Sequence, residues 1–545
     1  MKLTFKTILC STMALTLAAC SSSSTSTAAT SSASTASDTF RYAIGGEANY
    51  PDPAIDGDSL TASILQLIGT TLYTIDGTGS AVPEAAESYD VSDDGLTYTF
   101  HLRDDLKWSD GEALTAADFE YGIKRTLTFS VADAGFNIYV SQYLANGDKY
   151  DESNSVADMT DLGVKAVDDT TLEFTLAQPC SYFVALTAMG VYMPAREDVA
   201  PEGDYTYADN PDNPVSGPYK ITSIDRASEI TFEKNEYYFD ADNMPTQYIT
   251  YTVITDTSAQ LLAFQNDEID FASSLDTSVI NQYDGQDELV IPGGIVNYYI
   301  QLYGTEGSTN KALEDVDIRK AITEAVDREA LCTALDAGEL YVPLYGFVPS
   351  GLPDAEEGSD FRTVGGDLFV EDVEDAKSIM ESKGYSEDNM LTLEYYYNDS
   401  TIHSTVAQVL QQQLAEIYIN VELKTGEIRT FFDDRTNGNF EMARNAYSAD
   451  YMDVSNYMNL WTKKNQDLRT AGDEHYDELC TEAENTTDVE ERYKLYHEAE
   501  EYFISEMYYQ VPLFQYGSFY LAKTNVSGIV YTPAGGTDLT YVKVS

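Results

Sequence analysis

Hydrophobic and polar residues alternate at several places in the first half of the chain, as they do in half-buried β-strands. The alternation predicts strands at 39–44, 97–102, 172–176 and 229–233. Ser216-Gly217-Pro218-Tyr219 is a turn that enters a further strand, which forms a predicted hairpin with 229–233. Apolar residues at helical spacing predict helices at 63–72 and 259–265. Another helix is predicted to run from Thr115 to about Thr126, because Thr115 and Asp118 have the spacing of a capping pair.

The second half of the chain shows the same mixture of periodicities. It predicts helices at 317–335, 373–383, 403–417 and 489–507, and strands at 419–423 and 511–522. Glycines at 338 and 384 follow two of these helices, as is typical of helix C-termini. Helices and strands therefore alternate throughout, and the predicted class is α/β or α+β with mixed sheets.

One stretch, 431–457, combines a predicted strand with charges of both signs. Residues 440–447 alternate as a strand does, after a turn at Asn437-Gly438. Arg435 precedes this strand and Arg444 lies within it. Asp450 follows the strand among aromatic residues. Fixed charges of both signs in one cleft suit a zwitterionic ligand such as a peptide. A surface loop with solvated charges is the alternative, and this stretch alone does not decide between them.

The N-terminus has the features of a bacterial export signal. Lys2 and Lys6 precede a short apolar run at 8–17, which is too short to span a membrane. Leu17-Ala18-Ala19-Cys20 resembles a lipobox, which implies cleavage before Cys20 and lipidation of its sulfur; an ordinary secretory signal cleaved near Ala19 is the alternative. Residues 21–37 are almost entirely Ser, Thr and Ala, as in a flexible tether. Lipidation predicts a protein anchored on the extracytoplasmic face of the cell membrane.

The composition excludes several functions. A formal net charge of -61 without a basic patch argues against binding nucleic acid or anionic lipid headgroups. No nucleotide-binding, hydrolase or zinc-protease motif is present in the sequence. Residues 90–95 resemble the start of a calcium loop, but His101 occupies the position of the closing glutamate, so no metal site is predicted. We therefore expect a binding protein without a cofactor and not an enzyme.

Several motifs along the chain resemble one known family. They are the segment Ser92–Phe119 (SDDGLTYTFHLRDDLKWSDGEALTAADF), Asp169-Thr170-Thr171-Leu172, Ser216-Gly217-Pro218-Tyr219, Asn266-Asp267-Glu268-Ile269-Asp270 and Asp315-Val316-Asp317-Ile318-Arg319-Lys320-Ala321. Together they are similar to the extracytoplasmic solute-binding proteins of peptide ABC importers, in the oligopeptide/dipeptide/nickel-binding family. The resemblance covers the chain from Thr39 to its end.

This resemblance implies a two-lobed α/β fold of the periplasmic-binding-protein type, with a cleft that closes about a hinge. Lobe 1 would comprise 38–275 and 510–545, with an extra subdomain inserted at about 70–195, and lobe 2 would comprise 276–509. Residues 1–19 would be the signal peptide and 20–37 the tether. The implied partners are an oligopeptide and the permease subunits of an ABC transporter, and the protein would act as a monomer.

The resemblance also implies roles for individual residues. Ala449-Asp450-Tyr451 matches the family's Ala-Asp-Tyr motif, whose aspartate pairs with the ligand's α-ammonium. Arg444, Arg435, His403 and Lys311 match cations that serve the ligand's C-terminal carboxylate in oligopeptide binders. Ala446, Tyr447 and Ser448 complete the predicted ligand-binding set.

Three positions differ from familiar members of the family. Tyr447-Ser448 replaces an aromatic-cysteine pair, so a disulfide found there cannot form. Gln66 stands where an arginine of the first lobe supports the aspartate, and Tyr139 or Tyr143 corresponds to a tyrosine that binds the ligand backbone. Dipeptide, glutathione, opine, nickel-chelate or oligosaccharide ligands are alternatives within the family. A surface-anchored peptide hydrolase or a receptor without a transport role is an alternative outside it.

Overall fold

The computed structural model describes residues 38–48, 51–55, 59–129, 136–305, 307–356, 358–463 and 472–545. The predicted signal peptide, Cys20 and the tether lie outside these residues. None of the described helices is both long enough and apolar enough to cross a membrane.

A seven-stranded mixed sheet brings together the two ends of the described chain. Its order is β12-β19-β11-β1-β10-β9-β8, and β1 runs parallel to both β10 and β11. The predicted strand at 39–44 and the predicted hairpin are confirmed here, since β8 and β9 pair antiparallel. The strands are β1 (Thr39–Ile44), β8 (Tyr219–Asp225), β9 (Glu229–Lys234), β10 (Tyr248–Val253), β11 (Phe271–Ala272), β12 (Leu289–Val290) and β19 (Tyr520–Ala522). The helices of this part are α1 (Ser59–Ile68), α6 (Thr257–Gln265) and α7 (Ser278–Tyr283).

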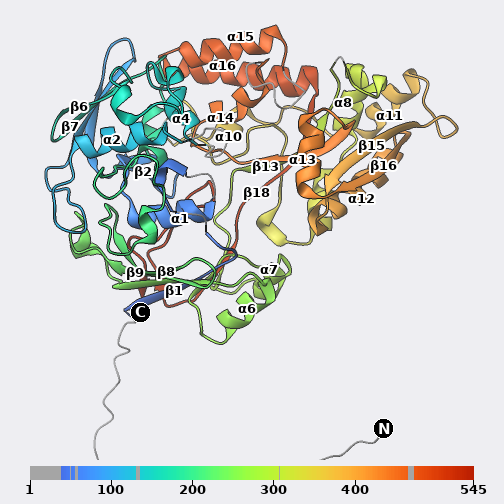
Figure 1. The fold of residues 1–545 in the computed structure, drawn as a ribbon. Coiled ribbons are helices and arrows are strands. Elements are labelled where there is room, and N and C mark those ends of the chain that lie inside the picture. The colour runs from blue at the N-terminus through green and yellow to red at the C-terminus, as the bar shows by residue number, and fades with distance from the viewer. Residues whose placement is uncertain are drawn as a thin grey trace, which may run out of the picture. The chain divides into compact units, whose positions relative to one another are not determined.

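A four-stranded antiparallel sheet with its own hydrophobic core lies between α1 and β8 in the chain. Its order is β4-β5-β7-β6, and α2 packs against it (Figure 1). Thr115 caps α2 in a capping box with Asp118, as the sequence predicts. The elements are β4 (Ala86–Val91), β5 (Thr97–Leu102), β6 (Val164–Asp168), β7 (Thr171–Thr175), α2 (Ala116–Thr126), α4 (Ile138–Ser141) and α5 (Phe183–Leu186).

A six-stranded sheet organises the second half of the chain, in the order β14-β18-β13-β17-β15-β16. α12 packs on β15 and β16, while α15 and α16 pair with each other (Figure 1). The strands are β13 (Val296–Leu302), β14 (Val342–Pro343), β15 (Leu391–Asn398), β16 (Ile419–Gly426), β17 (Met442–Tyr447) and β18 (Gln510–Tyr516). The helices are α8 (Val316–Glu324), α9 (Arg328–Leu335), α10 (Phe361–Gly365), α11 (Val373–Ser382), α12 (Thr401–Ala415), α13 (Ile428–Thr436), α14 (Ser455–Met458), α15 (Glu474–Asn485) and α16 (Val489–Glu501).

Short strand pairs complete the fold. They are β2 (Tyr73–Ile75) with β3 (Ala81–Pro83), β20 (Val526–Ser527) with β23 (Lys543–Val544), and β21 (Val530–Tyr531) with β22 (Thr537–Asp538).

The chain passes between the seven-stranded and the six-stranded sheet at 291–295 and again at 517–519. The strand pairing places these passages later than the predicted lobe boundaries at 275/276 and 509/510, because β12 pairs with β19 and β18 pairs with β13. At the passages the backbones touch: a Cβ on Gly294 would lie 2.1 Å from the Cα of Gly517. Glycine on both segments is what allows this approach.

Several predicted elements differ from the structure in their bounds. The helix predicted at 317–335 divides into α8 and α9, because Asp327 leaves the helix and caps α9 with its side chain. The strand predicted at 511–522 divides into β18 and β19, with Gly517 at the change of sheet. The helix predicted at 63–72 is α1, which begins and ends four residues earlier. In the last case the predicted helix extends past α1 into 69–72, a connecting segment that is itself buried.

Candidate functional site

The strand β17 places the charged stretch of the sequence. It lies between β13 and β15, with Arg444 opposite Ile300 and Ala446 opposite Tyr298 in the β13 register. The sequence predicts the strand correctly, but the alternation does not reveal that it is central and that Met442 to Asn445 are all buried. After Tyr447 the chain leaves the sheet in a loop that carries Ser448 and Asp450.

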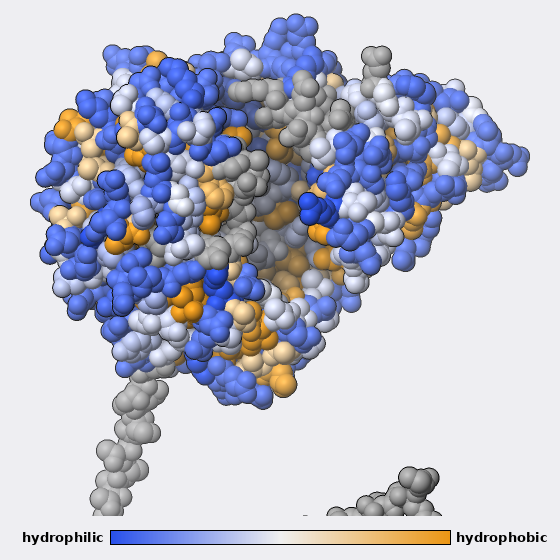
Figure 2. Space-filling model, in the orientation of Figure 1, coloured by the Kyte–Doolittle hydropathy of each residue, from blue (hydrophilic) through white to orange (hydrophobic). Residues whose placement is uncertain are grey.

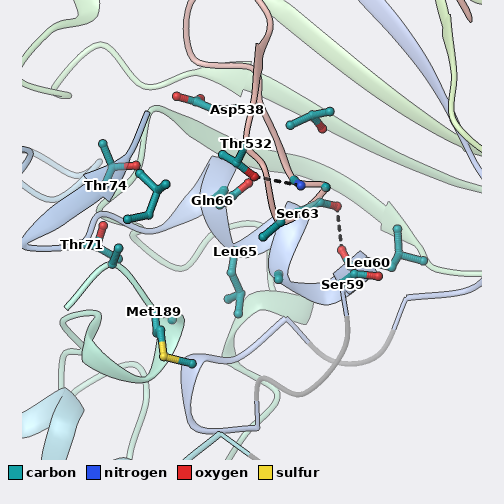
Figure 3. A pocket seen from close by; sticks show the side chains of 18 of the residues that line it. Ser59, Leu60, Ser63, Leu65, Gln66, Thr71, Thr74, Met189, Thr532 and Asp538 are labelled. Carbon is teal, nitrogen blue, oxygen red and sulfur yellow. Dashed lines mark hydrogen bonds between the residues drawn. The ribbon is translucent and has the colours of Figure 1, made fainter. Parts of the chain in front are cut away.

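This loop borders a cavity of about 740 Å³. The volume lies in the range of ligand-binding pockets, and Figure 2 shows the surface hollowed in its middle. The opposite walls come from α1 and from the C-terminal segment. Figure 3 shows Ser63 and Gln66 of α1 beside Thr532, whose hydroxyl accepts a hydrogen bond from the amide of Gly536 at 3.0 Å. Gln66 stands where the family resemblance implies an arginine that supports the aspartate. It thus lines the same cavity as Asp450.

The Asp450 carboxylate is held by hydroxyl groups. Oδ2 accepts a hydrogen bond from the hydroxyl of Tyr139 at 2.7 Å and from that of Tyr447 at 3.3 Å. Asn456 accepts hydrogen bonds from the Asp450 amide at 2.9 Å and from the Tyr447 hydroxyl at 2.8 Å. Solvent reaches the carboxylate through the cavity, but protein surrounds it on its other sides. This desolvation raises the pKa of Asp450, although the hydrogen bonds from the hydroxyl groups oppose the rise. Within the described chain Asp450 has no cationic partner, so it is free to receive a ligand ammonium.

The residue after Asp450 is anchored in another part of the molecule. Tyr451 belongs to the hydrophobic core of the four-stranded sheet, where its ring stacks on Tyr182 with centroids 4.9 Å apart. Tyr139 also contacts Tyr451, edge to face at 5.7 Å. The site around Asp450 is therefore built from the part of the chain that packs around the four-stranded sheet and from the loop after β17 together. Tyr139, one of the two tyrosines that the sequence leaves open, is the one that contacts Asp450, whereas Tyr143 bonds Tyr182.

Arg444 and Arg435 lie close together on aromatic rings. The Arg444 guanidinium carbon is 4.9 Å from the centroid of Phe431 and 5.6 Å from that of Phe432. The corresponding Arg435 distances are 5.8 and 5.1 Å. Both rings come from α13, which begins at Ile428 and ends at Thr436. The two arginines that the sequence analysis names together are thus close in space, and the sequence does not reveal the two rings as their support.

Neither arginine is neutralised. Arg444 is 8% exposed and donates through Nε to the side-chain oxygen of Asn398 at 2.7 Å, and Arg435 donates to that of Asn445. Burial lowers the pKa of Arg435, and the charge of Arg444 lowers it further. Among the described residues no carboxylate pairs with either guanidinium. A pair of desolvated cations bonded only to amides favours an anion as its missing partner.

His403 lies in the same region but in a neutral form. Its Nδ1 is 2.9 Å from the hydroxyl of Tyr298. Desolvation and the charge of Arg444 lower its pKa to about 4. Near neutral pH it can therefore donate or accept a hydrogen bond, but it carries no charge for a carboxylate in the present arrangement.

Lys311 is not brought together with these groups. It lies at the start of a 3₁₀ turn, with its side chain 67% exposed and paired with Glu314 at 2.5 Å. The neighbouring Asn310 bonds the carbonyl of Thr392, six residues before Asn398 on β15. Six residues of strand span about 20 Å, so Lys311 lies toward the opposite end of β15 from the arginines. Its predicted role is not supported by contacts of this structure.

The remaining predicted residues fall into two groups. Tyr447 and Ser448 border Asp450, and Ser448 lines the cavity. Ala446 is half-buried on β17, and its amide donates to the Asn445 side chain at 2.9 Å, so its part is to position its neighbours. A second hollow, of about 550 Å³, is lined by residues 398–399 and 425–428 and lies next to the Arg444–Asn398 contact. Over the described ranges no group of three or more His, Cys, Asp or Glu side chains is arranged to hold a metal ion.

The two-lobed α/β fold and the cavity beside the loop after a central strand are those of a solute-binding protein. The chain belongs to the bacterial extracellular solute-binding proteins, family 5, whose sequence model matches residues 80–468.

Several relatives carry names that refer to peptides. The dipeptide-binding protein DppE of Bacillus subtilis is 29% identical over 493 residues, which cover 90% of this chain and 88% of the relative. The oligopeptide-binding protein OppA of the same organism is 28% identical over 498 residues, with coverage of 89% and 88%. The solved substrate-binding domain of an oligopeptide ABC transporter from Bacillus anthracis is 26% identical, with a TM-score of 0.71 and coverage of 94% and 99%.

Proposed function

We propose that the chain binds oligopeptides outside the cytoplasmic membrane and delivers them to the permease of an ABC importer. The observation that carries the proposal is that charges of both signs have no oppositely charged partner among the described residues. They are the Asp450 carboxylate and the desolvated guanidinium groups of Arg444 and Arg435. A free peptide supplies one partner for each. The family and the names of the relatives support the same class of ligand.

Asp450 lines the larger cavity, and Arg444 bonds Asn398, which lines the second hollow, so the two charges would hold opposite ends of a peptide. The peptide would lie extended, with its main chain bonded as an added strand. Its ammonium would bind Asp450 and its carboxylate Arg444, with Arg435 serving longer peptides.

The amino-terminal contact is tested by calorimetry with free-amino and N-acetylated tripeptides. An unpaired charge enclosed in the closed cleft costs on the order of 3–5 kcal/mol, so acetylation is expected to weaken binding roughly a hundred- to a thousandfold. Asp450→Asn should bind the free-amino peptide with a similar loss and should discriminate little against the acetylated one. Equal binding of the two peptides by the parent protein would remove this role from Asp450.

The carboxyl-terminal contact is tested with free-acid and amidated peptides of three, four and five residues. We expect amidation to weaken binding of the shortest peptide at least tenfold in the parent and much less in Arg444→Met. Arg435→Met should lower discrimination mainly for the longer peptides. Lys311→Met serves as the matched control, because Lys311 pairs with Glu314 at the surface, and it should behave as the parent does. The absence of any penalty for amidation would contradict the carboxylate role of both arginines.

We further propose that Cys20 carries a lipid that holds the protein at the extracytoplasmic face of the cell membrane. The proposal rests on the Leu-Ala-Ala-Cys sequence and on the tether that follows it. Mass spectrometry of protein from a bacterial membrane fraction should detect a diacylated N-terminal cysteine. Cys20→Ala protein recovered in the membrane fraction to the same extent would contradict it.

A further inference from the structure

The charged side chains in the described lining of the cavity that holds Asp450 are all carboxylates. Three carboxylates border it: Glu84, Asp450 and Asp538. They come from the segment after β3, from the loop after β17 and from β22, so the acidity is assembled by the fold and is not a run in the sequence. Among the described lining residues there is no lysine, arginine or histidine. The peptide ammonium accounts for Asp450 and leaves the other two carboxylates without a cationic partner in the described chain.

Glu84 is fixed with one oxygen bonded to its neighbours. Oε2 accepts hydrogen bonds from the amide and the hydroxyl of Thr71, at 2.8 and 2.5 Å. Oε1 has only a long contact, 3.3 Å, from the hydroxyl of Tyr238. Desolvation raises the pKa of Glu84 despite the bonds from Thr71, and the charge of Asp538 adds to the rise. The two carboxylates therefore repel each other in a partly desolvated wall.

Asp538 completes this wall together with aromatic rings. Its Oδ1 accepts a hydrogen bond from the Thr540 amide at 2.8 Å, and no ion pair involves it within the described chain. The rings of Tyr238 and Tyr541 line the same cavity, and the Tyr541 hydroxyl is held by Asp240 at 2.5 Å. In Figure 3 Asp538 lies above Gln66 and Thr532. Carboxylates combined with aromatic faces are the groups that bind ammonium and guanidinium cations.

Arg103 lies near this wall but does not neutralise it. Its guanidinium carbon is 4.3 Å from the centroid of Phe239, which also lines the cavity. Its Nε and Nη2 donate to Asp105 at 3.0 and 3.1 Å, so its charge already has a partner.

We propose that the cavity selects peptides that carry a lysine or arginine side chain close to the amino terminus, and that Glu84 and Asp538 receive this side chain. The inference rests on the proposed peptide-binding function, because it is Asp450 that places the amino-terminal part of the ligand in this cavity. A cationic side chain would relieve the repulsion between two carboxylates in a space from which much of the bulk water is excluded. An acidic side chain in the same place would add a third like charge.

The test is calorimetry on the full chain with a panel of tripeptides that differ in one side chain. The panel has lysine, arginine, norleucine, alanine or glutamate as residue 1 or residue 2, with alanine elsewhere. We expect the lysine and arginine peptides to bind at least tenfold more tightly than the norleucine peptide of similar shape, at one of the two positions. The glutamate peptide should bind at least tenfold more weakly than the alanine peptide.

Variants test whether Glu84 and Asp538 cause the preference for a cationic side chain. Glu84→Gln and Asp538→Asn should each reduce the preference for lysine over norleucine several-fold, and the double variant should bring it below about threefold while trialanine binds as before. Glu87→Gln is the matched control, since it removes one exposed negative charge three residues from Glu84, outside the cavity lining, and the preference should persist. Thermal unfolding of each variant verifies that it is folded.

The outcomes separate the two proposals. Tight binding of the whole panel with equal affinity for lysine and norleucine peptides would overturn the charge preference and leave peptide binding in place. A preference that survives in the double variant would overturn the assignment to Glu84 and Asp538. No binding of any peptide would overturn the proposed function itself. If a variant does not fold, the comparison of lysine, norleucine and glutamate peptides on the parent protein still decides the preference.

Discussion

At the scale of single residues, the charged groups of the site are hydrogen-bonded to neutral side chains and not to one another. Asp450 is bonded to tyrosine hydroxyls, and Arg444 and Arg435 to asparagine side chains. Neutral partners satisfy hydrogen-bonding capacity without cancelling charge, so each group stays available to a ligand. An ion pair between the protein's own residues would have to be broken before binding.

His403 makes stability depend on pH. Its pKa of about 4 lies below the value of about 6.5 expected in the unfolded chain, so the unfolded state binds the proton first as pH falls. The stability that the neutral ring contributes is complete above pH 6.5 and is lost progressively down to about pH 4. With allowance for solvent screening, we expect this loss to be on the order of 2 kcal/mol.

Urea unfolding of the parent and of His403→Asn at pH 7, 6, 5 and 4.5 measures this contribution. The unfolding free energy of the variant should fall less over this range than that of the parent. The imidazole proton resonances of His403 should titrate near pH 4 in the ligand-free protein. A midpoint near 6.5 would contradict the prediction.

Individual residues of the site differ in how far the sequence reveals them. Asp450, Arg444 and Arg435 are charges in a short aromatic stretch, and motif matching places them. Asn398, Phe431 and Asn456 are chemically ordinary, and they acquire their roles only because the strands and the loop bring them to the charges. Lys311 differs from them, since it lies in a turn near the opposite end of β15 from the arginines.

At the scale of elements, a buried ion pair fixes the loop that carries Asp450. Arg492 on α16 bonds both oxygens of Asp453, at 3.0 and 2.5 Å, and its guanidinium lies 5.2 Å from the ring centroid of Tyr182. Both side chains are at most 5% exposed. The pair therefore joins α16, the loop and the core of the four-stranded sheet at one point.

Removing one member of this pair should destabilise the protein strongly. Arg492→Met leaves Asp453 buried without its cation, and we expect a loss of about 3–5 kcal/mol in the free energy of unfolding. The double variant Arg492→Met/Asp453→Leu should recover much of the loss, because no buried charge is left unpaired.

Denaturant unfolding compares these variants with a control on the same helix. Lys494→Met breaks an exposed pair with Glu491 and should cost less than about 1 kcal/mol. A loss for Arg492→Met as small as that of the control would show that the buried pair does not hold the loop.

Hydrophobic periodicity predicts the bounds of some elements and not of others. Alternation places β1 and β5 correctly because these strands are half-buried, and the Thr115–Asp118 spacing places the start of α2. It fails for the helix predicted at 317–335, where the break at Asp327 lies inside a continuous apolar pattern. A single capping side chain decides that break, and a polar residue at that position is also common within helices.

At the scale of the whole molecule, the two passages between the sheets meet at glycines. A Cβ on Gly517 would lie 1.9 Å from the carbonyl oxygen of Gly293, and backbone atoms cannot move aside as a side chain can. Gly517→Ala should therefore separate the two passages and cost roughly 2 kcal/mol or more in stability, with weaker peptide binding because the lobes no longer meet correctly.

Thermal unfolding and calorimetry with one tight-binding peptide measure both effects. Gly77→Ala is the control, since its added methyl would have no neighbour closer than 3.6 Å and no positive φ is involved. Unchanged stability and unchanged affinity in Gly517→Ala would contradict the role of the close approach.

The family motifs predict the arrangement of the two lobes, whereas hydrophobic periodicity does not. The two-lobed architecture follows from the family motifs alone. The motifs do not predict the points at which the chain changes sheet. These points are set by β12 and β18, which lie past the expected boundaries and pair with strands distant in sequence.

The acidic cavity has a consequence for the rate of capture as well as for selectivity. A cavity bordered by carboxylates, in a chain of net charge -61, attracts cationic solutes over distances set by ionic strength, about 10 Å at 0.1 M salt. Association with cationic peptides should therefore be accelerated in dilute media and slowed as salt is added, while dissociation changes little. The same protein would collect basic peptides fastest in fresh water and lose much of that kinetic advantage in saline surroundings.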